Sequence, residues 1–154
     1  MKLSKIVFIK NRYNRIYTVP ANATVLDTAK KLVECNAGAL LIHEPGCNPM
    51  KYIGIVSERD IVRRLCTDNG DTRNLKVSEI MTKDLIVADI NDDVDYVMRV
   101  MTNKKIRHIP VLENSKVVAL LSNRHIIEAL HEEDEIKIRH LSDYVSGNRG
   151  NQVF

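Results

Sequence analysis

The chain has 154 residues, a length that fits one compact domain or two small ones packed together. Apolar residues make up 44% of the chain but aromatic residues only 5%, with no Trp, so any core is built from aliphatic side chains and Met. The net charge of +3 argues against the dense basic surface of a nucleic-acid-binding protein, although it is compatible with small anionic ligands.

The N-terminal segment, residues 1–14, is basic and carries no pattern typical of a leader. Its longest apolar run covers residues 6–9, far short of a signal-peptide core, and no later segment reaches the length of a membrane span. The three cysteines have no C-x-x-C spacing, which argues against a disulfide framework and a zinc–thiolate site. We therefore expect a cytoplasmic protein with no metal site and no membrane partner.

A first group of elements is predicted over residues 15–67, in the order strand, helix, strand, strand, helix. A short strand ends near Val19, and Asn22 can cap the helix that follows. Apolar residues recur at helical spacing in that helix. Two apolar strands are then expected near 39–43 and 52–56, and a second helix near 58–66.

A linker is predicted over residues 68–84. Its first part, Asp-Asn-Gly-Asp at residues 68–71, has strong loop chemistry. Further on, the sequence VSEIM at residues 77–81 predicts a single helical turn.

The second group of elements, over residues 85–132, repeats the first. In an alignment of the two copies Thr24 falls on Asp93 and Ser57 on Ser122. The second copy is therefore expected to contain the following elements: a strand ending near Val87, a helix with Asn91 near its start, strands near 108–112 and 116–121 joined by the tight turn ENSK, and a helix near 123–132. Each half buries little surface alone. We expect an α+β (mixed α/β) fold in which two β-α-β-β-α repeats pack about a pseudo-twofold axis.

The C-terminal segment, residues 133–154, has apolar residues at approximately helical spacing. They are Ile136, Leu141, Tyr144 and Val145. This spacing predicts a terminal helix that packs on the core, followed by a frayed tail from Gly147 onward.

The stretch GIVSERDI, residues 54–61, places a serine where a strand ends and a helix begins. The simplest interpretation is a helix cap, in which Ser57 accepts from first-turn amides and Asp60 reaches back to it. The same helix start also suits a phosphate, because it offers unpaired N–H groups and the positive end of a dipole. Asp60 would repel the phosphate, but its carboxylate can accept from both hydroxyls of a ribose. Ser57 and Asp60 are therefore candidate residues for nucleotide binding.

Cations that could neutralise the phosphate come from the second copy. Arg107 and His108 lie where its first helix turns into its central strand, and Arg124 lies at the start of its last helix. A guanidinium group matches phosphate oxygens in a bidentate geometry and is never neutral. Each residue alone is most simply a solvated charge. Together, across a pseudo-twofold axis from Ser57 and Asp60, they predict a site shared by the two copies.

These features resemble a tandem pair of cystathionine β-synthase (CBS) domains, often called a Bateman module. The resemblance covers about residues 15–132, and the combination of GIVSERDI with IRHIPV is more specific than either motif alone. It implies a regulatory module rather than an enzyme, with an adenine nucleotide (AMP, ADP or ATP) or a related adenosyl ligand in the cleft between the repeats. It also implies signalling by conformational change to a separate partner protein, a homodimer formed through helices, and no further cofactor.

The resemblance implies roles for nine residues. They are Asp60 for the ribose hydroxyls; Ser57 and Arg59 for the ribose-phosphate; Arg107, His108 and Arg124 for the phosphates; and Val56, Ile109 and Pro110 for the apolar wall near the base.

The pseudo-equivalent site of the second copy departs from this pattern. Ser122 is kept, but His125 stands where the first copy has Asp60, and Ala119 where it has Gly54. A neutral imidazole has one acceptor nitrogen and cannot accept from both ribose hydroxyls. We expect Ser122 and His125 to form a weaker site, and the chain to bind one nucleotide well.

Two other classes of function are weighed against this one. An enzyme is disfavoured, because the sequence shows no catalytic triad that can be placed, no H-E-x-x-H and no P-loop. The main alternative is a protein- or nucleic-acid-interaction module with no small ligand, for which Lys104, Lys105, Arg107 and Arg124 could contact a nucleic-acid backbone. Nucleic acid is the less favoured partner, because aromatic residues for base stacking are scarce.

Overall fold

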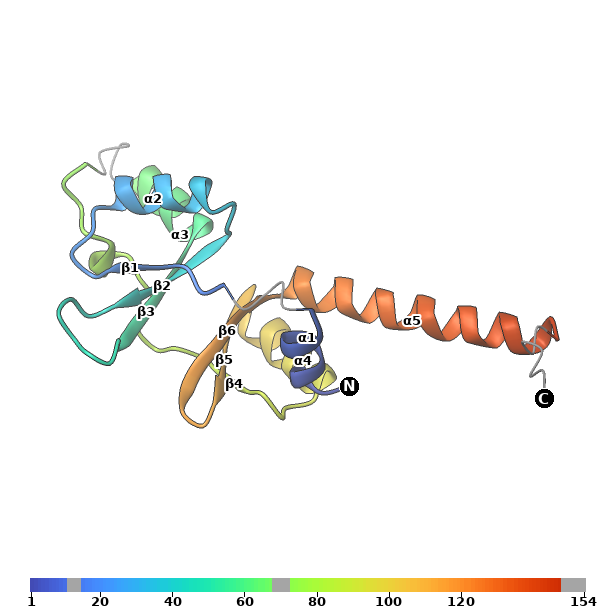
Figure 1. Cartoon of the computed structure of the whole chain (residues 1–154). Coiled ribbons are helices and arrows are strands. Elements are labelled where there is room, and N and C mark those ends of the chain that lie inside the picture. Colours follow the sequence, from blue (N-terminus) through green and yellow to red (C-terminus); the bar gives the residue numbers. More distant parts are fainter. Residues whose placement is uncertain (11–14, 68–72, 148–154) are drawn as a thin grey trace.

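The structure, a computed structural model, describes residues 1–10, 15–67 and 73–147, without the side chains of residues 8–10. It contains two three-stranded sheets, one in each sequence repeat, with helices packed on each sheet (Figure 1). The expected α+β fold of two β-α-β-β-α repeats is confirmed. The predicted fraying beyond Gly147 lies outside the described residues.

The first repeat consists of five elements: β1 (Thr18–Pro20), α2 (Val25–Glu34), β2 (Ala39–His43), β3 (Tyr52–Ser57) and α3 (Glu58–Thr67). Its central strand β2 pairs parallel to β1 and antiparallel to β3. Thr24, and not the predicted Asn22, caps α2, because its hydroxyl accepts from the amide of Asp27 at 3.0 Å.

The second repeat has the same order: β4 (Ala88–Asp89), α4 (Val94–Lys104), β5 (His108–Glu113), β6 (Lys116–Ser122) and α5 (Asn123–Val145). Asp93, rather than Asn91, caps α4 by accepting from the amide of Asp95 at 3.0 Å. The tight turn expected between β5 and β6 is formed by Asn114 and Ser115, both with positive φ, as in the two-residue turns favoured in hairpins.

The linker between the repeats crosses the edge of the first sheet. It forms the predicted single turn, a 3₁₀ helix at Val77–Glu79, and then Thr82 pairs with Ile55 through two backbone hydrogen bonds of 2.9 and 3.0 Å. Gly54 lies beneath this crossing. A Cβ atom at Gly54 would lie 2.5 Å from Sδ of Met81 and 3.1 Å from the carbonyl oxygen of Thr82. Glycine is therefore required where the linker passes β3.

Replacing Gly54 by Ala is expected to lower the free energy of unfolding by about 1–3 kcal/mol, the usual cost of overpacking a filled site. The added methyl group must displace Met81 and the backbone at Thr82. Urea unfolding monitored by circular dichroism measures this change. An Ala variant as stable as the parent chain would show that the linker moves away from β3 without cost.

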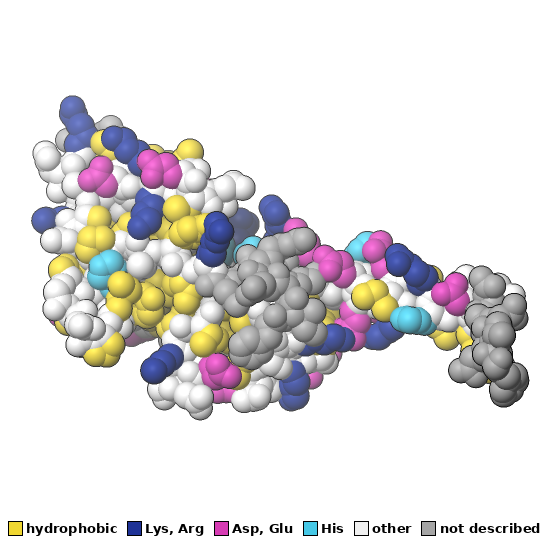
Figure 2. All heavy atoms as spheres, in the orientation of Figure 1, with side chains coloured by type: hydrophobic (Ala, Val, Ile, Leu, Met, Phe, Trp, Pro, Cys, Tyr) yellow, Lys and Arg dark blue, Asp and Glu magenta, His cyan; other side chains and the backbone are white. Residues whose placement is uncertain are grey.

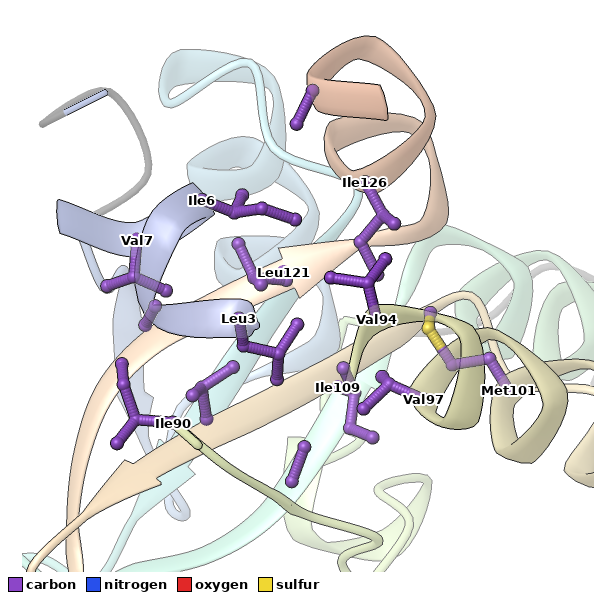
Figure 3. Close-up of a cluster of buried hydrophobic side chains, with 14 residues drawn as sticks. Leu3, Ile6, Val7, Ile90, Val94, Val97, Met101, Ile109, Leu121 and Ile126 are labelled. Carbon is purple, nitrogen blue, oxygen red and sulfur yellow. The ribbon is translucent and has the colours of Figure 1, made fainter. Parts of the chain in front are cut away.

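The two repeats have separate hydrophobic cores, and the N-terminal helix α1 (Leu3–Lys10) belongs to the second. Leu3, Ile6 and Val7 are at most 1% exposed and lie over Leu121 and neighbouring side chains (Figure 3). The amide of Leu3 also donates to the carbonyl of Asp92 at 3.0 Å. Helix α1 therefore packs on the second repeat, although it precedes the first repeat in sequence, and its docking is not predicted by the sequence pattern.

The last helix, α5, is a single helix of 23 residues that extends away from the two repeats (Figure 1). Only Ile126 and Ala129 in it are buried, and every residue from 134 to 147 is exposed. The expectation that the C-terminal segment packs on the core is wrong. Its apolar residues continue the helix that begins at Asn123 and lie in solvent.

Candidate functional site

Among the crevices lined by described residues of both repeats, two are related by the pseudo-twofold arrangement of the elements. The first, which we call the Asp60 crevice, has a volume of about 410 Å³ and is lined by the β3–α3 junction, the linker and the α4–β5 turn. The second, the His125 crevice, has a volume of about 1240 Å³ and is lined by the β6–α5 junction, the α2–β2 turn and the residues before β1. Gly38, Glu58, Arg107 and His108 line both crevices.

Ser57 and Asp60 form a reciprocal cap at the start of α3. The amide and hydroxyl of Ser57 both donate to Oδ2 of Asp60, at 2.8 and 3.0 Å, and the amide of Asp60 approaches the Ser57 hydroxyl at 3.4 Å. The other carboxylate oxygen, Oδ1, has no hydrogen-bond partner among the described residues. The cap interpretation is thus correct, and it leaves an anionic acceptor that faces the Asp60 crevice.

Cations outnumber carboxylates around the Asp60 crevice. Its described lining contains five basic side chains and three acidic ones, which are Arg59, Arg63, Lys104, Lys105 and Arg107 against Glu58, Asp60 and Asp84. The basic groups come from both repeats, from the first two turns of α3 and from the end of α4. The crevice therefore combines a local acceptor with a positive field suited to phosphate.

The lining of this crevice also contains Arg63, Lys104, Lys105 and Asp84, which are not among the predicted site residues. Arg63 follows Arg59 by four residues, so helical spacing alone places both on one face of α3. Lys104 and Lys105 were considered only as contacts for a nucleic-acid backbone. Asp84 enters the lining because the linker pairs with β3 at Thr82.

Six of the nine residues predicted for the nucleotide site line the Asp60 crevice: Ser57, Arg59, Asp60, Arg107, His108 and Pro110. Val56 and Ile109 do not, since their side chains are 0% and 1% exposed within the two cores. Successive side chains of a strand point to opposite faces. Ile55 and Ser57 therefore face the crevice while Val56 faces the core. The apolar wall is made instead by Ile55, Leu85, Ile86, Ile106 and Pro110.

Arg124 lines the His125 crevice and not the Asp60 crevice, so its predicted place beside Asp60 is wrong. The pseudo-twofold axis puts the first turn of α5 at one crevice and the first turn of α3 at the other. The Nε atom of Arg124 also donates to Glu128 at 2.9 Å, one turn along α5.

Ser122 and His125 repeat the cap of Ser57 and Asp60 with different chemistry. The Ser122 amide donates to Nδ1 of His125 at 3.2 Å, and the His125 amide donates to the Ser122 hydroxyl at 3.2 Å. Burial is the main cause that lowers the pKa of His125, with Arg124 acting in the same direction and Glu128 against it. The ring is therefore neutral at pH 7 with its proton on Nε2, and its acceptor nitrogen is used by the cap.

The charges of the His125 crevice are balanced. Three basic residues, Arg15, Arg107 and Arg124, face three acidic ones, Glu58, Glu128 and Glu132, in its described lining. The positive excess of the Asp60 crevice is not repeated there.

His108 lies in the wall between the two crevices, close against Gly38. A Cβ atom at Gly38 would lie 2.9 Å from Nε2 of His108. Burial lowers the pKa of His108 to about 4, and the nearby His125 and Arg107 act in the same direction. Because the ring is neutral at pH 7, His108 can form a hydrogen bond with a ligand but adds no positive charge, contrary to its expected role as a cation.

Comparison with known proteins places these features in a family context. A family model described as the CBS domain matches the chain twice, at residues 11–67 and 77–132. The mitochondrial CBS domain-containing protein CBSX3 of Arabidopsis thaliana is 31% identical over 126 residues, which cover 80% of this chain and 61% of that protein. The chain thus spans less than two thirds of the length of this relative.

Solved structures share the fold. A putative signal-transduction protein with CBS domains from Burkholderia ambifaria MC40-6 is 30% identical with a TM-score of 0.77, over 84% of this chain and 93% of that one. The CBS domain pair of protein MJ0100, solved in complex with 5′-methylthioadenosine and S-adenosyl-L-methionine, is 23% identical with a TM-score of 0.71, over 86% of this chain and 98% of that one. Across the described residues of this chain, we find no helix with the length and apolar character needed to cross a membrane.

Proposed function

Because this chain belongs to the CBS domain family, we propose that it is a regulatory module that binds an adenine nucleotide or a related adenosyl ligand in the Asp60 crevice. One observation carries the proposal. Among the described residues, a carboxylate oxygen without a protein partner and five basic side chains from both repeats line the same crevice of about 410 Å³. A ribose with a charged substituent is the ligand class that uses both.

The chemistry of the lining suggests an orientation for the ligand. Oδ1 of Asp60 accepts from the ribose hydroxyls, and the apolar wall around Ile55, Ile86 and Pro110 contacts the base. Phosphate oxygens then lie near Arg107 and the lysines at the end of α4, where guanidinium and ammonium groups neutralise them. The adenosyl ligands bound by MJ0100 support this ligand class.

The position of the crevice suggests how a bound ligand is signalled to a partner protein. Its walls come from both repeats and from the linker that crosses β3, so a ligand that contacts all three favours one relative position of the repeats. A partner protein that recognises that position receives the signal. The role is regulatory rather than catalytic, and the cytoplasmic location stays a prediction.

Titration of the chain with AMP, ADP, ATP, NAD and S-adenosylmethionine is expected to reveal at least one ligand that binds with a stoichiometry of one per chain. At a concentration of 100 times its Kd, such a ligand stabilises the fold by about 2.7 kcal/mol and raises the Tm by about 5–10 °C. Isothermal titration calorimetry and thermal unfolding measure these effects. Two strong sites per chain would contradict the weakness of the His125 crevice, and no shift with any of the five ligands would contradict the proposal.

The alternative, a nucleic-acid-interaction module, predicts a different result. Affinity for DNA or RNA would fall steeply with salt concentration, because it depends on the release of counterions from the backbone. The three carboxylates among the cations of the Asp60 crevice oppose a polyanion, so we expect no such affinity in an electrophoretic mobility assay.

A further inference from the structure

The distal part of α5 has an apolar surface that no described residue of the chain covers. The helix is about 35 Å long at 1.5 Å per residue, and Ala129 is its last buried residue. Ile127, Leu141 and Tyr144 are 54%, 64% and 71% exposed. The stability of helices in proteins comes mostly from packing of an apolar face.

Four apolar residues of α5 follow the spacing of a coiled coil, with Asp134 and Lys137 between them, and one of the four, Leu130, also packs against the core of the second repeat. The exposed Ile136, Ile138 and Val145 lie off this line. Positions 127, 130, 134, 137, 141 and 144 alternate steps of three and four residues, as the seam positions of two paired helices do. We call these six residues, Ile127, Leu130, Asp134, Lys137, Leu141 and Tyr144, the α5 stripe. Its ends are apolar and its centre holds one acidic and one basic residue.

The stripe is complementary to itself when a second copy runs in the opposite direction. Pairing about the midpoint between residues 135 and 136 sets Ile127 against Tyr144, Leu130 against Leu141, and Asp134 against Lys137. The Asp134–Lys137 pair then occurs twice, once with the carboxylate of each copy. A parallel pair in register would instead set Asp134 against Asp134 and Lys137 against Lys137, which is repulsive.

The charges outside the stripe favour the same direction. Outside the stripe, residues 128–135 contain four carboxylates, whereas residues 136–145 contain one carboxylate, Asp143, together with Arg139. An antiparallel pair brings the acidic half of each helix beside the more basic half of the other. Figure 2 shows acidic, basic and hydrophobic side chains following one another along this projecting helix.

We infer that the α5 stripe is a self-recognition surface, on which a second copy of this chain docks to form an antiparallel two-helix dimer held in register by reciprocal Asp134–Lys137 pairs. The inference rests on α5 alone and is independent of the ligand proposed for the Asp60 crevice. Helix α5 begins directly after its cap residue Ser122, at the end of β6 in the second repeat. The repeats of the two copies would therefore lie at opposite ends of the paired helices.

Exchanging the charges of Asp134 and Lys137 tests whether these residues pair between two copies of the chain. By sedimentation velocity, the full chain is expected to dimerise, and Asp134→Lys or Lys137→Asp alone should raise the dimer dissociation constant roughly tenfold or more, because each creates two like-charge contacts. The double variant D134K/K137D restores opposite charges and should return the constant to near its original value. Asp143→Lys, with the same charge change on the opposite face of α5, is the matched control.

Disulfide cross-linking tests whether the two α5 helices run antiparallel. In a background with Cys35, Cys47 and Cys66 replaced by Ser, Ile127→Cys and Tyr144→Cys place single thiols about 26 Å apart along the helix. Oxidation with copper phenanthroline should give disulfide-linked dimers in a mixture of the two variants and not in either variant alone. A monomeric parent chain, equal effects of Asp134→Lys and Asp143→Lys, or disulfides formed by a single variant would each overturn the inference.

Discussion

Replacing Asp60 by Asn is expected to weaken the binding of the adenosyl ligand by about 10- to 100-fold. Hydrogen bonds to a charged group contribute about 1.5–3 kcal/mol, and the substitution removes the charge from the acceptor that faces the ribose. Asn has the same shape, and its side-chain oxygen can still accept from the amide of Ser57, so the cap at α3 is largely kept. Calorimetric titration at one ionic strength measures the loss of affinity.

The matched control is His125→Asn at the pseudo-equivalent cap. An Asn oxygen can replace Nδ1 as the acceptor of the Ser122 amide, so that both variants place Asn at the same position of the cap, although only the Asp60 variant removes a charge. We expect the His125 variant to keep the affinity of the parent chain within a fewfold change. Equal losses in both variants would move the ligand away from the Asp60 crevice, and unchanged binding by the Asp60 variant would exclude the carboxylate as the ribose acceptor.

The two crevices differ in the side chain that completes the cap of their helix, which is Asp60 in one and His125 in the other. Both helix starts use the same reciprocal cap, with serine at its first position. A carboxylate has two oxygens and can support the cap with one while the other accepts from a ligand. The imidazole of His125 has one acceptor nitrogen and commits it to the cap. Both copies therefore have the same cap, but among the described residues Asp60 has a second acceptor atom left over and His125 does not.

Much of the fold could be predicted from the sequence because the chain repeats itself. The order of elements in both copies, the tight turn after Glu113 and the single turn at Val77 all depend on local spacing and turn chemistry. The caps were misplaced by two residues, because Asn22 and Asn91 are cap-competent side chains close to the true caps at Thr24 and Asp93.

The incorrect predictions at the site have a common cause. Tertiary contacts decide which face of a strand or helix points into a crevice. Both faces of the central strands are apolar, so the sequence could not show that Ile109 points to the core and Pro110 to the crevice. Arg124 was assigned to the wrong crevice because a pseudo-twofold axis separates two helix starts that look alike in sequence. The docking of α1 on the second repeat depends on contacts between residues far apart in the chain.

The stability of the chain is expected to fall as the pH is lowered from 6.5 toward 4, because of His108. Its pKa is about 4 in the folded chain, against an ordinary value of 6.5, and the main cause is burial. In this range the unfolded chain binds the proton and the folded chain does not, so protonation favours unfolding. The expected loss is about 2 kcal/mol by pH 5 and about 3 kcal/mol by pH 4. The lowered pKa of His125 acts in the same direction.

Urea unfolding at pH 7.5, 6.5, 5.5 and 5.0 measures this dependence, and a His108→Gln variant isolates its origin. Gln carries no titratable proton, so the free energy of unfolding of the variant should change much less over the same range. The matched control is His131→Gln, in which the replaced side chain is 73% exposed on α5, and it should keep the full pH dependence. If His108→Gln retains the slope of the parent chain, the acid sensitivity originates elsewhere, and the buried ring between the two crevices is not the group that links protonation to unfolding.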